Sequence, residues 1–88
     1  MNECETKMRV QLAVLEPTTL EIVDESWKHA GHAGARDGGG HYVLRIVSAQ
    51  FVGNNTVARH RMIYSALGKL MKREIHALTI QAHTPDET

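Results

Sequence analysis

The chain has 88 residues, of which 42% are hydrophobic and 23% are charged. This length supports one small hydrophobic core and is too short for two, so we expect a single domain over residues 1–88. Its 10 basic and 10 acidic residues cancel to a formal net charge of zero, which excludes binding to nucleic acid or anionic membranes through bulk charge alone.

The first predicted element is a helix over residues 2–15. Met8, Leu12 and Leu15 recur at spacings of three and four, which is the period of one helix face. Pro17 disfavours helical backbone at the residue before it, so the helix should end near residue 15 or 16.

A strand is predicted next over residues 19–26, followed by a loop over residues 27–40. The strand places Leu20 and Ile22 on one side. Glycine loses the most backbone freedom when it is ordered, so the five glycines of residues 27–40 predict a long hairpin loop rather than a regular element. The loop carries His29 and His32.

A second strand is predicted over residues 41–51, opened by His41. Tyr42, Leu44 and Ile46 alternate with the residues between them, as expected for a strand with one buried side. The loop before it makes the two strands an antiparallel hairpin.

A helix over residues 56–73 is predicted after the Gly53-Asn54-Asn55 turn, with Thr56 as its N-cap. A short extra helical turn near residues 68–74 is an alternative to one continuous helix. At about 100° per residue, one face collects Val57, His60, Ile63, Tyr64, Leu67, Leu70 and Met71. Five basic residues accompany this face with no acid among them: Arg59, Arg61, Lys69, Lys72 and Arg73.

The last predicted element is a strand over residues 75–83, and residues 84–88 are expected to be frayed. His76, Leu78, Ile80 and Ala82 would share one side of this strand. A strand–helix–strand order within one sheet implies a right-handed crossover, with the third strand parallel to the second. The order α-β-β-α-β predicts an α+β fold, with helices packed on one face of a three-stranded mixed sheet.

Several motifs in this order resemble those of the BolA family. They are Phe-x-Gly from Phe51, Val-x-Arg-His-Arg-x-Ile-Tyr-x-x-Leu from Val57, and Ile-His-Ala-Leu-x-Ile-x-Ala from Ile75. Supporting residues lie upstream in 20–26, 41–42 and 46–48, and the resemblance covers roughly residues 12–86. It implies the BolA fold, which is similar to the class II KH domain.

The six histidines are the sequence feature that most needs a functional explanation. Imidazole suits iron, zinc and copper, and it can replace thiolate on one iron of a [2Fe–2S] cluster. The family resemblance implies a monothiol glutaredoxin as partner, in a heterodimer that shares such a cluster. The glutaredoxin would give a cysteine, glutathione a thiolate, and this chain two ligands. His76 matches the family's C-terminal histidine, and either His29 or His32 fits the loop ligand, with His41 as the next candidate.

We expect no enzymatic activity, because no serine has the setting of a nucleophile and Gly38-Gly39-Gly40 precedes a strand rather than a helix. The alternative function is transcriptional regulation, which the family resemblance also implies. The basic residues of helix 56–73 would then contact DNA phosphates. Against this, residues 53–56 lack the Gly-x-x-Gly pattern of KH domains. A basic face that is only solvated, or that meets an acidic protein, is the other interpretation.

A cytoplasmic location is expected, with an organelle such as the mitochondrion as the alternative. No apolar run approaches the ~20 residues of a membrane span, and the N-terminus lacks the pattern of a signal peptide. The single cysteine, Cys4, excludes an internal disulfide and favours a reducing compartment. Cys4 lies at the solvated start of the first helix and is interpreted as an incidental thiol.

Overall fold

The structure is a computed structural model that describes residues 2–26 and 40–88. Its helices and strands are α1 (Glu3–Leu12), β1 (Thr19–Asp24), β2 (Gly40–Val47), α2 (Thr56–Leu67), α3 (Leu70–Arg73) and β3 (Ile75–His83). Three short 3₁₀ turns complete them: η1 (Ala13–Leu15), η4 (Ala49–Phe51) and η5 (Pro85–Glu87). The short α3 confirms the extra helical turn near residues 68–74.

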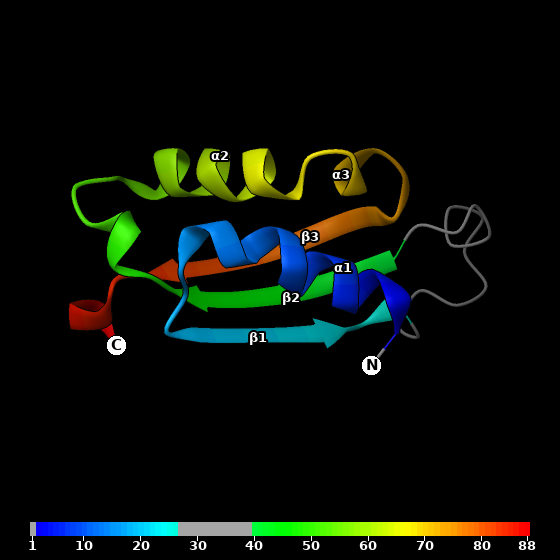
Figure 1. Cartoon of the computed structure of the whole chain (residues 1–88), viewed down its shortest axis with the longest axis horizontal. Helices are drawn as coiled ribbons and strands as arrows, with labels where there is room; N and C mark the ends of the chain where they lie inside the picture. The colour runs from blue at the N-terminus through cyan, green and yellow to red at the C-terminus, as the bar shows by residue number, and fades with distance from the viewer. Residues whose placement is uncertain (1, 27–39) are drawn as a thin grey trace.

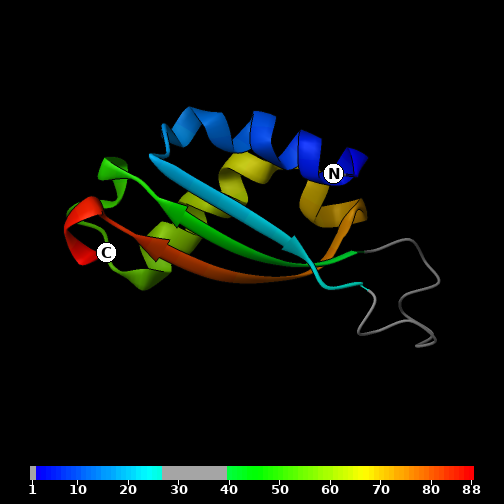
Figure 2. The same ribbon diagram turned by 90° about the horizontal axis from the view of Figure 1, so that it is seen from below.

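The strands form one sheet in the order β1-β2-β3, with β1 antiparallel to β2 and β3 parallel to β2 (Figure 1). Seen from below, the helices lie together on one face of this sheet (Figure 2). The predicted α+β fold and its mixed three-stranded sheet are therefore confirmed. None of the helices in the described ranges is long and apolar enough to cross a membrane.

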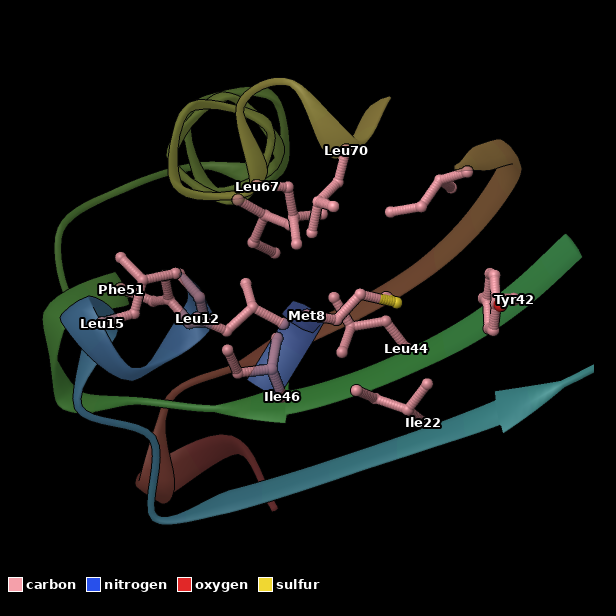
Figure 3. Packing of buried hydrophobic residues seen from close by; sticks show 12 residues of the cluster. Met8, Leu12, Leu15, Ile22, Tyr42, Leu44, Ile46, Phe51, Leu67 and Leu70 are labelled. Atoms are coloured by element: carbon pink, nitrogen blue, oxygen red, sulfur yellow. The ribbon is translucent and has the colours of Figure 1, made fainter. Parts of the chain in front are cut away.

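The core lies between the sheet and the helix layer. In Figure 3, Met8 and Leu12 of α1 and Leu67 of α2 point toward Leu44 and Ile46 of β2. These five side chains are fully removed from solvent. The other buried members of the cluster are Leu15, Ile22, Tyr42, Phe51, Ile63, Leu70 and Ile75.

The start and end of α1 follow local chemistry. The side chain of Asn2 caps the helix by accepting a hydrogen bond from the Glu5 backbone N–H at 2.7 Å. The helix tightens into η1 and ends at Glu16, whose φ of 50° turns the chain before Pro17. The predicted boundary near residue 15 is correct.

The second strand ends at Val47, so the prediction that it continues to Phe51 is wrong. Ser48 stops it: the Ser48 side chain accepts a hydrogen bond from the Gln50 backbone N–H at 3.0 Å and donates one to the Leu15 carbonyl at 2.5 Å. Residues 49–51 form η4, and Phe51 is buried from that turn. Phe51 is out of phase with the alternating Tyr42, Leu44 and Ile46, and it reaches the same core only because the chain turns at η4.

The N-cap of α2 is Asn55 rather than the predicted Thr56. The Asn55 side chain accepts a hydrogen bond from the Ala58 backbone N–H at 2.9 Å, and Thr56 is the first helical residue. Both residue types cap helices well, so the error is a shift of one position.

The buried face of α2 is rotated from the predicted face. Val57 and Tyr64 are 59% and 42% exposed, whereas Met62 and Ala66 pack against the core. The true stripe follows i, i+3, i+4 spacing from Arg59, which takes the first position of the stripe although it is charged.

Arg59 can lie on the core side of the helix because its guanidinium donates four hydrogen bonds there. Its Nη1 and Nη2 atoms donate to the Glu87 carboxylate at 2.6 and 2.9 Å, and its Nε donates to the Asn54 carbonyl at 2.7 Å. The guanidinium also lies 6.0 Å from the centroid of the Phe51 ring. We call this ion pair between Arg59 and Glu87 the C-terminal clasp.

The C-terminal clasp overturns the prediction that residues 84–88 are frayed. These residues form η5 with a capping box, in which Thr84 and Glu87 each accept a hydrogen bond from the other's backbone. The hydrogen bonds from Arg59, and then from the Thr84 backbone, lower the pKa of Glu87 from 4.5 to about 2.

Candidate metal-ligating site

Two histidines meet where the parallel strands begin. β2 and β3 are neighbours and run in the same direction, so their first residues lie at the same end of the sheet. The His41 and His76 rings have their centroids 5.1 Å apart with their planes tilted by 44°. The structure therefore brings together two predicted ligands, one before and one after the α2–α3 crossover in the sequence.

An irregularity in the pairing of β2 with β3 determines where the His76 side chain points. Gly40 is opposite Ile75, but His41 is opposite Ala77, so β3 has one extra residue at this point. Such a bulge interrupts the alternation of side chains along a strand. Ile75 is buried in the core and His76 is exposed, so the prediction that His76 shares a side with Leu78 is wrong.

His41 lies on the sheet surface that faces away from the helices. It precedes Tyr42, which is 5% exposed in the core, and neighbouring strand residues point to opposite faces. The His76 ring, at 5.1 Å, lies beside it on the same accessible end of the sheet.

The backbone beneath this pair is held from both neighbouring strands. The His41 N–H donates to the Ser26 hydroxyl at 3.0 Å, and the His41 carbonyl accepts from the Glu25 N–H at 2.7 Å. On the other side, the Gly40 N–H donates to the Glu74 carbonyl at 3.0 Å. A ring on such a fixed backbone loses little freedom when it binds a ligand.

Asp24 stabilises the turn that carries Ser26. Its carboxylate accepts the Ser26 backbone N–H at 2.8 Å, and hydrogen bonds from Ser26 lower the pKa of Asp24. The carboxylate stays charged at neutral pH and keeps the end of β1 in place against His41.

The histidine pair can act as half of a metal site. Metal–imidazole bonds are about 2 Å long, so two rings whose centroids are 5.1 Å apart can place a nitrogen each on one metal ion. Within residues 2–26 and 40–88, no group of three or more His, Cys, Asp or Glu side chains is arranged to hold a metal ion. A metal bound here therefore needs further ligands beyond this described set.

The remaining candidate ligands are two histidines of the predicted loop and the single cysteine. His29 and His32 lie outside the described residues, so their predicted role stays a prediction. Cys4 is half-buried, with its Sγ 3.9 Å from the Glu74 carbonyl, and burial raises the pKa of its thiol. A thiol kept protonated is a poor ligand, which agrees with the interpretation of Cys4 as incidental.

The five predicted nucleic-acid residues fall into two groups. Arg59 is committed to the C-terminal clasp with its side chain 13% exposed, so a phosphate contact there would have to displace Glu87. Arg61, Lys69, Lys72 and Arg73 are exposed, and among the described residues none of the four forms an ion pair. Sequence reasoning missed the clasp, whose only signal was a charged residue at a core spacing.

Comparisons with known proteins agree with this architecture. A family model described as BolA-like protein matches residues 12–87. SufE-like protein 1, chloroplastic/mitochondrial, from Arabidopsis thaliana is 49% identical over 78 residues, which are 83% of this chain and 21% of that protein. The DNA-binding transcriptional regulator BolA of Escherichia coli (strain K12) is 39% identical over 83 residues, covering 94% of this chain and 73% of that protein.

A solved structure gives the same result in three dimensions. The BolA domain of SufE1 from Arabidopsis thaliana superposes with a TM-score of 0.87 and 42% identity, covering 100% of this chain and 99% of that one. The matched segment is about a fifth of the SufE-like protein and nearly three quarters of the Escherichia coli regulator. The whole chain covers 99% of the isolated BolA domain. The family and these relatives are not named for a catalytic activity.

Proposed function

The chain belongs to the BolA family, and on that premise we propose that it is a non-enzymatic partner of a monothiol glutaredoxin. The two proteins would form a heterodimer that shares a [2Fe–2S] cluster, in cluster trafficking or in signalling of iron status. The glutaredoxin partner is inferred from the family resemblance. The observation in this chain that supports it is the His41–His76 ring pair at an accessible end of the sheet.

The pair suits a cluster that is held as shared cargo. Such a cluster needs only part of its ligands from this chain, and imidazole can replace thiolate at an iron. His76 is the proposed fixed ligand because it is exposed at the start of a rigid strand. Its companion is either His41, which the ring contact favours, or one of His29 and His32, which the family's loop position favours.

The proposal is tested by transferring a cluster from a holo-glutaredoxin, with glutathione present and oxygen excluded. Visible absorption and circular dichroism report the ligands, and size-exclusion chromatography reports the heterodimer. His76→Ala should abolish the imidazole-ligated spectrum, and only one of His29→Ala, His32→Ala and His41→Ala should reproduce most of that loss. Retention of the wild-type spectrum by His76→Ala would refute the shared-ligand proposal.

His83→Ala is the matched control for His76→Ala. His83 is on the same strand with its side chain 40% exposed, but it lies at the opposite end of β3 from the histidine pair. The control should keep the cluster spectrum. A thermal melt of each variant without cluster separates loss of a ligand from loss of the fold.

DNA binding is a second candidate function, favoured by the exposed cations Arg61, Lys69, Lys72 and Arg73. Phosphate contacts by these residues would be mostly electrostatic, and each lost contact flattens the slope of log affinity against log salt by about 0.9. We expect Lys69→Ala, Lys72→Ala and Arg73→Ala together to flatten that slope in titrations of labelled duplex DNA. An unchanged slope would remove the DNA proposal for this surface.

The proposed compartment is the cytoplasm or an organelle. The Arabidopsis relative is named as chloroplastic/mitochondrial, and that name describes a protein about five times as long as the matched segment. Either compartment is compatible with a single half-buried cysteine, which has no second cysteine in this chain to pair with.

A further inference from the structure

The helix layer contains a groove that the proposed cluster site does not use. It lies between α1 and the α2–α3 segment and consists of two adjoining hollows that share Gln11 and Leu70. One hollow has a volume of about 500 Å³ and is lined by Gln11, Lys69, Leu70, Lys72, Arg73 and Glu74. The other, of about 220 Å³, is lined by Thr6, Lys7, Val10, Gln11 and Leu70. We call these together the α1–α3 groove.

From α1 the groove receives one exposed apolar side chain, Val10, beside Thr6, Lys7 and Gln11, and the surface of the smaller hollow is mostly apolar. Val10 is 68% exposed, and Val14, one turn further along the chain in η1, is 64% exposed. Val14 continues the surface into a third hollow that it shares with Met62 and Ala66 of α2. Single exposed valines are common, but two on successive turns beside a hollow form a stripe that a partner can cover.

The end of the groove at α3 is positively charged. Lys69, Lys72 and Arg73 line it, and within the described part of the chain none of them pairs with a carboxylate. Glu74 is also there, but it is engaged by the Lys7 ammonium at 3.2 Å. Carboxylates brought by a partner would therefore meet three cations that have no competing acid of their own.

We propose that the α1–α3 groove docks an acidic amphipathic segment of a partner protein. Apolar side chains of the segment would cover Val10 and the edge of Leu70, and its carboxylates would pair with Lys69, Lys72 and Arg73. This combination of an apolar hollow and a cationic end matches the way a helix binds in a groove. The proposal goes beyond cluster sharing and does not depend on it, because the groove is built from helices and the histidine pair from strands.

The groove fits a peptide better than nucleic acid. A phosphate backbone gains nothing from the apolar hollow of about 220 Å³ beside Val10, and a duplex is too wide to enter it. Within the groove, the cations that could meet phosphates lie mainly in the few residues from Lys69 to Arg73, since Arg61 is outside its lining and Arg59 is held by Glu87. Charge complementarity combined with an apolar surface therefore favours an acidic protein segment.

The test uses a fluorescein-labelled synthetic helical peptide with leucines spaced i, i+4 and glutamates at the other exposed positions. A second peptide replaces every glutamate with glutamine, and a labelled duplex DNA is the third probe. Fluorescence anisotropy with the intact chain measures each affinity. We expect the glutamate peptide to bind, the glutamine peptide to bind about tenfold more weakly, and DNA not to compete.

Two groove variants and two matched controls locate the site. Lys72→Glu combined with Arg73→Glu, and separately Val10→Ser, should each weaken the glutamate peptide about tenfold. Arg61→Glu reverses one charge and Val57→Ser repeats the valine-to-serine change, both at exposed positions of α2 outside the groove lining, and they should leave the affinity unchanged. All five substituted positions are exposed, so the variants should fold, and circular dichroism verifies this.

Three results would overturn the proposal. The first is equal weakening by the groove variants and the controls, which would mean nonspecific attraction. The second is displacement of the peptide by DNA with loss of DNA binding in the charge-reversed variant, which would assign the surface to nucleic acid. The third is failure of the glutamate peptide to bind the intact chain at all. The cluster-transfer spectra are unaffected by these outcomes, so this proposal and the proposed function fail separately.

Discussion

Replacing Leu67 with alanine tests the buried face of α2, and its comparison with Tyr64 tests the rotation of that face. Leu67 is fully buried, and Figure 3 shows it above Leu44 and Ile46 of β2. The substitution removes three carbons, which costs about 2.4 kcal/mol of transfer free energy at about 0.8 kcal/mol for each. With the cavity that remains, the loss of unfolding free energy should reach about 3–5 kcal/mol.

Urea denaturation followed by far-ultraviolet circular dichroism measures this loss. For a domain of this size, about 3 kcal/mol corresponds to a fall in melting temperature of at least about 12 °C. Small domains are marginally stable, so Leu67→Val, which removes one carbon and should cost about 1 kcal/mol, gives a graded second point if the alanine variant does not fold.

Tyr64→Ala and Lys69→Ala are the matched controls for Leu67→Ala. Tyr64 lies on the face predicted from periodicity, but it is 42% exposed in the structure. Its truncation should cost far less than that of Leu67, and Lys69→Ala should cost almost nothing. If Tyr64→Ala were as destabilising as Leu67→Ala, the face described here would be wrong.

The remaining predictions concern the C-terminal clasp and the α2 cap. Glu87→Gln should lower the urea midpoint at pH 6 by breaking the pair with Arg59. Because the folded pKa of Glu87 is lowered to about 2, this stabilisation is present above its ordinary value of 4.5 and is lost as pH falls toward 2, so the difference from wild type should shrink over that range. A difference that stays constant from pH 6 to pH 2 would contradict the pairing. Asn55→Ala should cost about 1 kcal/mol of unfolding free energy and Thr56→Ala much less, since Asn55 caps the helix; the reverse order would restore Thr56 as the cap.

Local periodicity was sufficient to predict the order and type of the helices and strands. The helical spacing of Met8, Leu12 and Leu15 and the alternation of Tyr42 and Leu44 each reflect a face that packs on the same core. The helix predicted between the last two strands then indicated the parallel pairing of β2 and β3, because a helical crossover returns the chain to the end of the sheet where the previous strand began.

Apart from the one-residue shift of the α2 cap, the features that were missed depend on contacts between residues far apart in the chain. β2 stops early because Ser48 bonds to the Leu15 carbonyl, and the α2 face is rotated because Arg59 finds its partner at Glu87. At the candidate site, His76 was identified through the family motif. Its direction depends on an extra residue in the pairing with His41, which no pattern within β3 reveals.

The parallel pairing of β2 and β3 also has a consequence for when the histidine pair exists. The hairpin of β1 and β2 closes locally, but β3 can join only after α2 and α3 have crossed the sheet, and such non-local pairings form late during folding. His41 and His76 therefore come together only in a chain whose last strand has docked. A nascent or partly folded chain cannot present both rings, so occupancy of this pair would itself report that folding is complete.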